Sequence, residues 1–124
     1  MDNSLIDQLI EICDSLRVPM DELAVGSQTS GLTHQAFCDA VARRIALRYL
    51  DGSLAFDAAD AAINNLHFYA FRPPELEPSP YMWSIYQAFD EGEYTHPGDS
   101  SDMFPPERYT RPQLLAILTG NSGE

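Results

Sequence analysis

The chain has 124 residues, of which 19 are Asp or Glu and seven are basic, all of them arginine, so that the formal net charge is −12. This length is typical of one domain with its own hydrophobic core, and a hydrophobic content of 44% argues against disorder. The charge argues against nucleic acid or anionic lipid as a partner, because phosphate groups would be repelled, and it favours a basic protein.

Apolar residues at helical spacing predict a first helix over residues 4–17, with Leu5, Leu9 and Ile12 on its buried side. A short helical turn over 20–24 and a polar loop over 26–31 are expected to follow. Cys13 lies in this apolar stripe and Cys38 in that of the next helix. We therefore expect both cysteines to be reduced, buried and inert.

Thr33 is placed to cap a second helix over 34–50, which the pair Asp51-Gly52 ends. A third helix is predicted to begin near Asp57, with Asp57 as its capping residue and Asp60 three residues later, and to run to about residue 71. Small residues along this helix allow another helix to approach closely.

Prolines predict an extended connector over 72–79, and Ser79 followed by Pro80 predicts the start of a fourth helix over 80–91. Residues 94–109 are expected to form a loop, and Thr110 to cap a last helix over 111–119. No stretch alternates apolar and polar residues as a half-buried strand does. We therefore predict an all-α fold, a single-domain bundle of about five helices over residues 1–124.

No apolar run approaches the roughly 20 residues of a membrane span, and the acidic N-terminal segment lacks the basic region of a signal peptide. We therefore expect a cytoplasmic protein that does not bind a membrane. The sequence contains no GxSxG, HExxH, paired CxxC or glycine-rich phosphate loop. A binding protein without catalytic residues, metal or cofactor is expected in preference to an enzyme.

Asp90 and Glu91 fall in the last turn of the fourth predicted helix, where the helix dipole disfavours each acid by about 0.3–1 kcal/mol. Either an internal arginine offsets this cost, with Arg72, Arg108 and Arg111 as candidates, or the acids are exposed for a basic partner. The two interpretations can coexist. The candidate partner-binding residues extend this acidic segment into the following loop and include the single tryptophan: Asp90, Glu91, Glu93, Tyr94, Asp99, Asp102 and Trp83.

Trp83, Tyr86 and Asp90 share one helical face, and aromatic anchors with a charge at their edge are typical of a binding hot spot. A lone tryptophan more often completes a hydrophobic core, and for Trp83 we favour that buried position.

Asp60, Asn64 and His67 share a face of the third predicted helix and allow a metal or acid–base site to be drawn. Helix capping by Asp60 and interhelical hydrogen bonds from Asn64 explain the same residues better.

Arg43, Arg44 and Arg48 form the basic cluster of the sequence. They indicate a solvated face with weak helical ion pairs to Asp39 and Asp51, or a contact that holds an acidic neighbour such as the first helix.

Residues 49–66 (YLDGSLAFDAADAAINNL) and 88–94 (AFDEGEY) resemble the acidic helical immunity proteins that accompany bacterial polymorphic or contact-dependent toxins. The resemblance implies a protein that neutralises a cognate toxin by tight occlusion. Many such toxins are basic nucleases, which agrees with the acidic composition because complementary charge steers association.

The function we expect is therefore that of a bacterial immunity or inhibitor protein that binds a basic toxin domain through its acidic surface. A secretion chaperone or adaptor that holds an effector in a hydrophobic groove is one alternative. A small metal-dependent enzyme that uses Asp60, His67 and the acids near Asp90 is the other.

Overall fold

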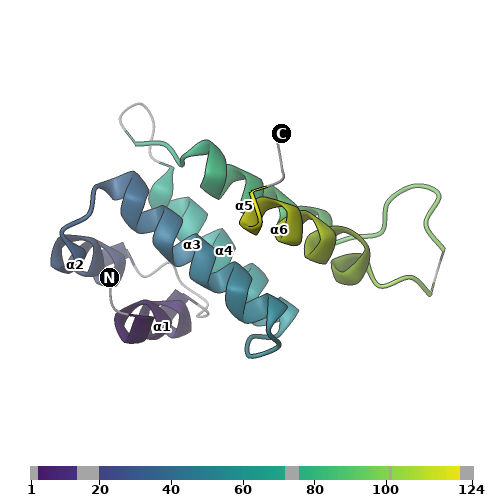
Figure 1. Ribbon diagram of the computed structural model, residues 1–124, viewed down its shortest axis with the longest axis horizontal. Helices are drawn as coiled ribbons and strands as arrows, with labels where there is room; N and C mark the ends of the chain where they lie inside the picture. The colour runs from purple at the N-terminus through teal and green to yellow at the C-terminus, as the bar shows by residue number, and fades with distance from the viewer. Residues whose placement is uncertain (1–2, 14–19, 72–75, 101, 121–124) are drawn as a thin grey trace.

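The computed structural model describes residues 3–13, 20–71, 76–100 and 102–120, and this part of the chain is all-α, as the sequence predicts (Figure 1). It contains no β-sheet, and none of its helices combines the length and the apolar character that a membrane span requires. The helices are α1 (Asn3–Cys13), α2 (Met20–Ser30), α3 (His34–Leu50), α4 (Phe56–Ala70), α5 (Pro80–Glu91) and α6 (Arg111–Leu118).

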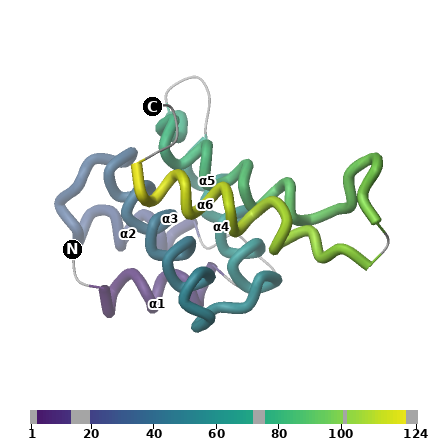
Figure 2. The backbone as a smooth tube through the Cα atoms, turned by 45° about the vertical axis from the view of Figure 1, so that its right-hand side comes forward, coloured from purple at the N-terminus to yellow at the C-terminus, as the bar shows by residue number. Residues whose placement is uncertain are grey.

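The long helix α3 lies at the centre and packs beside α4 (Figures 1 and 2). α1 and α2 pack on one side of this pair, and α5 and α6 pack together on the other. Phe37, Val41 and Ile45 of α3 are fully buried where the two sides meet. The segment between α5 and α6 extends away from the helical body in both views.

The predicted starts of α3 and α5 are confirmed. The Thr33 hydroxyl accepts a hydrogen bond from the backbone N–H of Ala36, and the Ser79 hydroxyl accepts one from Met82, so each cap satisfies a donor that a helix start leaves free. Pro80 occupies the first turn of α5, where its missing N–H has no cost.

The expected capping of α4 by Asp57 is wrong. α4 begins one residue earlier, at Phe56, and no side chain caps it. The ring of Phe56 packs 6.0 Å from that of Tyr49 and 6.1 Å from that of Phe89, so burial of this aromatic residue sets the start of the helix. Asp57 stays exposed in the first turn, and Asp60 lies within the helix.

The loop expected over residues 26–31 is also wrong, because helix α2 continues to Ser30. Gly26 is buried, and a Cβ atom placed on it would come within 2.8 Å of Cδ1 of Leu9. The missing side chain therefore lets α2 pack closely on α1, and this packing outweighs the low helix propensity of a polar, glycine-containing segment.

The sequence predicts that Thr110 caps the last helix, and this prediction is wrong. A π-helical turn, Pro106–Thr110, runs directly into α6, so the predicted loop ends at about residue 105. Thr110 is fully buried, and its hydroxyl donates a 2.7 Å hydrogen bond to the backbone oxygen of Ala88. This contact attaches the start of α6 to α5 and fixes Thr110 in helical conformation.

Residues 14–17 of the predicted first helix and 72–75 of the predicted connector lie outside the described residues. Cys13 and Cys38 are buried and unpaired, as expected, and burial raises the pKa of each thiol to about 12. Both remain protonated at neutral pH and are poor nucleophiles in that state.

Candidate partner-binding surface

Three of the predicted binding residues form the end of α5 and the turn after it. We call Asp90, Glu91 and Glu93 the acidic end. Asp90 and Glu91 are half-buried and Glu93 is exposed. Glu91 accepts a hydrogen bond from the Gln113 amide at 2.5 Å, and Glu93 accepts one from the Asn64 amide at 3.2 Å. Neutral donors thus hold two of these carboxylates in place without cancelling their charge.

No arginine of the described residues forms an ion pair with the acidic end. Arg111 instead pairs with Glu107, with Nε 2.6 Å from the carboxylate, and it also donates to the backbone oxygen of Leu50. Arg108 lies over the ring of Tyr109, with its guanidinium carbon 5.8 Å from the ring centre. Arg72, the third arginine considered as a counterion, lies outside the described residues.

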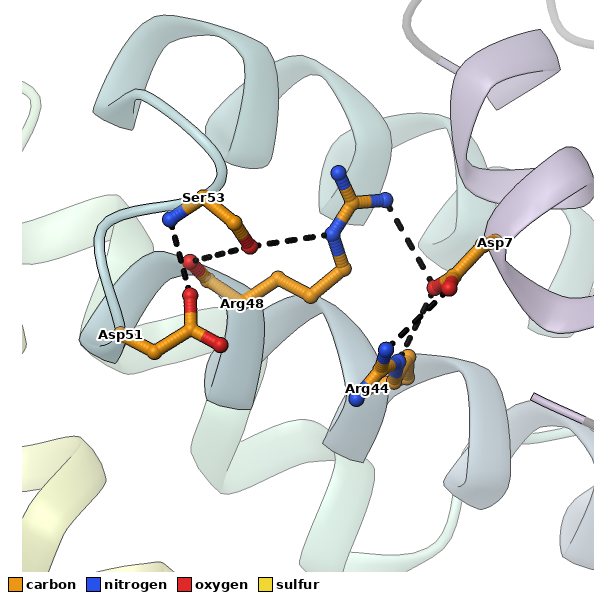
Figure 3. A network of polar contacts seen from close by, with 5 residues as sticks. All are labelled: Asp7, Arg44, Arg48, Asp51 and Ser53. Carbon is orange, nitrogen blue, oxygen red and sulfur yellow. Dashed lines mark hydrogen bonds and ion pairs between the residues drawn. The ribbon is translucent and has the colours of Figure 1, made fainter. Parts of the chain in front are cut away.

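The basic cluster of α3 neutralises α1 instead (Figure 3). Arg44 donates to both carboxylate oxygens of Asp7, at 2.9 and 3.1 Å, and Arg48 approaches the same carboxylate at 3.6 Å. The hydrogen bond from Arg44 lowers the pKa of Asp7 below its ordinary value. Of the two interpretations of this cluster, the contact with the first helix is confirmed, whereas the favoured ion pairs to Asp39 and Asp51 do not form among the described residues. Arg44 and Arg48 are therefore occupied away from α5.

His96, which the sequence does not single out, forms a hydrogen bond with the last residue of α5. Its Nε2 lies 2.9 Å from the backbone oxygen of Glu91, and since a carbonyl only accepts, Nε2 carries the hydrogen and donates it. The rings of Tyr94 and Tyr109 flank the imidazole, with centroids 4.4 and 4.0 Å away. A histidine five residues beyond a helix end gives no periodic signal in the sequence.

Asp99 and Asp102 lie apart from the acidic end, on the segment that projects beyond the helices (Figure 2). Asp99 accepts hydrogen bonds from the Tyr109 hydroxyl at 2.7 Å and from the backbone N–H of His96 at 2.8 Å. Asp102 accepts one from the Ser100 hydroxyl. The hydrogen bonds from Tyr109 and Ser100 lower the pKa values of Asp99 and Asp102, so both stay ionised while they shape the loop.

Trp83 is 40% exposed, so the favoured expectation that it completes the core is wrong. Its indole stacks on Tyr86, with ring centroids 5.5 Å apart. Tyr86 in turn stacks on His67 of α4 at 4.0 Å and 17°. Three aromatic rings therefore form a layer on the outer side of the α4–α5 contact. Tryptophan and tyrosine are among the residues most enriched in hot spots at protein interfaces.

Asp60 lies at the contact between α4 and α5, next to the acidic end. Burial, a hydrogen bond with Glu93 and the negative charges of Glu93, Asp90 and Asp57 raise the pKa of Asp60 to about 8. The Asp60–Glu93 pair therefore retains a proton at neutral pH, because two carboxylates this close resist ionising together. Asn64 bridges the pair, donating to Glu93 and to the backbone oxygen of Asp60, which confirms its predicted structural role.

His67 is the other titratable group in this contact. Burial lowers the pKa of its imidazole, so the ring is neutral at pH 7. Its Nδ1 atom is buried and has no hydrogen-bond partner among the described residues, and the same holds for Oδ1 of Asp60. Across those residues no three His, Cys, Asp or Glu side chains converge closely enough to hold a metal ion.

An open hollow lies between α5 and α6 beside the acidic end. It measures about 480 Å³, and its walls include Asp90, Glu91, Gln87 and Ile117. A long basic side chain can lie with its methylene groups against Ile117 and its charged head at the carboxylates.

Comparison with protein-family models, curated proteins and solved structures gave no significant match.

Proposed function

We propose that this chain is an inhibitor of the immunity-protein type, which binds a basic toxin domain through the acidic end and the loop that follows α5. The observation that carries the proposal is the separation of charge. Arg44, Arg48 and Arg111 pair with Asp7 and Glu107, whereas the acidic end has only neutral donors among the described residues. Its carboxylates remain available to cations of another molecule.

Two physical properties favour rapid and specific binding at this surface. The excess of negative charge steers a basic partner towards it, and this steering weakens as salt increases. Hydrogen bonds from Gln113 and Asn64 hold Glu91 and Glu93 before the partner arrives, which reduces the entropy lost on binding. Tyr94, 51% exposed beside the acidic end, adds an aromatic contact.

The proposal predicts that the charge of α5's last turn controls association. A basic protein encoded by a neighbouring gene should be retained by the purified chain at low salt. The double substitution Asp90→Arg with Glu91→Arg should slow association at least tenfold and weaken its salt dependence. Surface plasmon resonance at several salt concentrations measures both effects.

The matched control is Glu11→Arg with Asp21→Arg, which makes the same change of net charge at exposed acids of α1 and α2. Equal slowing by both double variants would show that net charge alone controls association and that the acidic end is the wrong surface. Failure to retain any basic protein at low salt would contradict the inhibitor proposal itself.

An adaptor that holds an effector segment is the second candidate, favoured by an apolar groove between α1 and α2. The groove measures about 350 Å³, and Leu5, Leu9, Ile12 and Val25 line it, the last with 62% of its surface exposed. Val25→Asp should abolish retention of an effector bound there. If the retained protein is lost with Val25→Asp and not with the Asp90 and Glu91 reversals, the adaptor function replaces the inhibitor.

A further inference from the structure

A second hollow lies where the end of α4 meets the start of α5. We call it the aromatic hollow. Its volume is about 420 Å³. Phe71 and Trp83, which are 45% and 40% exposed, form two of its walls, and Glu77 supplies a carboxylate. The remaining lining residues are Gln35, Pro78, Ser79 and Pro80.

Contacts with neighbouring residues hold the side chains that line the aromatic hollow. The His67 ring lies 5.9 Å from that of Phe71 and 5.4 Å from that of Trp83, so it supports both walls. The Gln35 amide donates to the backbone oxygen of Glu77 at 3.1 Å, and the Ser79 hydroxyl donates to Asp39. Because these contacts already fix the site, a ligand loses little free energy in ordering it.

The chemistry of the aromatic hollow suits an organic cation. The faces of tryptophan and phenylalanine attract a positive charge within about 6 Å, and a guanidinium group adds planar stacking to that attraction. Glu77 can pair with the same group through its carboxylate. The Glu77 carboxylate is exposed at the edge of the hollow and would repel an anionic ligand, so charge complementarity favours a cation.

The aromatic hollow is joined to the acidic end by one continuous contact. The rings of Trp83, Tyr86 and His67 connect them, and Tyr86 lies in the electrostatic field of Asp90 and Glu93. Trp83 and Asp90 are seven residues apart on α5, which corresponds to about 10 Å along the helix axis. A peptide in the polyproline II conformation covers about 9 Å in three residues, and because this helix has three residues per turn, the side chains at both ends of that span lie on the same face.

We propose that the aromatic hollow receives an arginine side chain of the basic partner, while a second basic residue, three positions away in a segment of polyproline II conformation, reaches the acidic end. This inference rests on the proposed function and specifies the segment that the partner presents. Arginine is preferred to lysine because only the guanidinium group stacks flat against the two aromatic walls.

The single tryptophan of the chain makes a direct test possible, since all indole fluorescence comes from Trp83. The probe is a hexapeptide with blocked ends that carries two arginines separated by two serines. Titration into the full chain at low salt should change the Trp83 emission saturably. The lysine counterpart should bind at least threefold more weakly. Phe71→Ala and Glu77→Gln should each weaken arginine-peptide binding at least threefold.

Phe68→Ala is the matched control, because Phe68 is an aromatic residue of α4 with 65% exposure that does not line the aromatic hollow. This variant should bind the peptide as the unchanged chain does. Isothermal titration calorimetry measures peptide binding independently of the fluorescence.

Three results would overturn the inference: no calorimetric binding of the arginine peptide, binding without a change in Trp83 emission, or equal effects of Phe71→Ala and Phe68→Ala. None of them decides the proposed function, which is judged by retention of the partner and by the Asp90 and Glu91 reversals. Loss of partner binding on reversal, together with an unresponsive Trp83, would support the inhibitor while excluding the aromatic hollow.

Discussion

At the scale of single residues, Asp60 links the acidic end to the stability of the fold. Its pKa is raised to about 8 by burial, by the hydrogen bond with Glu93 and by neighbouring carboxylates. In the unfolded chain an aspartate has a pKa near its ordinary value of about 3.9. Between these two values the folded protein holds a proton that the unfolded chain releases. The free energy of unfolding therefore falls as pH rises from about 4 to about 8 through this group.

The substitution Asp60→Asn should remove the loss of stability that Asp60 causes as the pH rises. At pH 4 the variant and the unchanged protein should be about equally stable, because Asp60 is then protonated. At pH 8 the variant should be more stable by about 1–2 kcal/mol, a figure reduced from the full linkage value because the site is only partly buried. Urea unfolding at several pH values measures the difference, with Asp21→Asn as the control. A stability difference that stays constant across this range would contradict the account.

Gly92 is the second residue on which the geometry of the acidic end depends. A Cβ atom at this position would lie 2.1 Å from Oγ1 of Thr110 and 3.1 Å from the ring of Phe56. Thr110 cannot rotate away without losing its hydrogen bond to Ala88. The turn after α5 therefore packs directly on the π-helical turn.

Gly92→Ala should destabilise the fold by about 2–3 kcal/mol through overpacking. Gly98→Ala is the control, because Gly98 has a positive φ of +91° and no atom near its Cβ position. It should cost only about 1 kcal/mol of backbone strain. Thermal unfolding of both variants separates the two effects, and an equal loss in both would refute the close contact between Gly92 and Thr110.

At the scale of helices, the ion pairs between α1 and α3 are polar contacts that help to position the first helix on the body (Figure 3). Asp7→Asn should lower the free energy of unfolding by about 1 kcal/mol at pH 7, since the pairs are partly exposed and screened. The loss should vanish as the pH falls through the lowered pKa of Asp7, because protonation then removes the same charge. Chemical denaturation tests this, with Glu11→Gln on the same helix as the control. A loss that does not diminish as Asp7 becomes protonated at acid pH would exclude the ion pairs as its cause.

Sequence reasoning located the helices well where side chains cap them, as at Thr33 and Ser79. The predicted helix boundaries were wrong where packing between helices determines the local structure. The low helix propensity of glycine predicts a loop at Gly26, but the close approach of α2 to α1 keeps this residue in the helix. Thr110 reads as a cap, yet its hydroxyl bonds to Ala88 across the interface with α5. Contacts between elements distant in the sequence carry no local pattern.

At the scale of the whole molecule, net charge predicts that an acidic surface exists but not where it lies. The described arginines that form ion pairs occupy α3 and α6, and the end of α5 keeps its charge. The candidate acids at the acidic end lie together as expected, whereas Asp99 and Asp102 belong to the projecting loop. The Asp60–Glu93 pair and the aromatic hollow each join residues from different elements through tertiary packing. Helical spacing shows which residues share a face of one helix, but it does not show which residues of another element they meet.

The central claim is that a cationic partner docks on the α5 side of the molecule. Chemical-shift mapping of the isotope-labelled chain with the retained partner, at low salt, tests it most directly. We expect the largest amide shifts at Asp90, Glu91, Glu93 and Trp83, with little change on α1 and α2. Shifts concentrated on α1 and α2, or spread evenly over the surface, would contradict the claim.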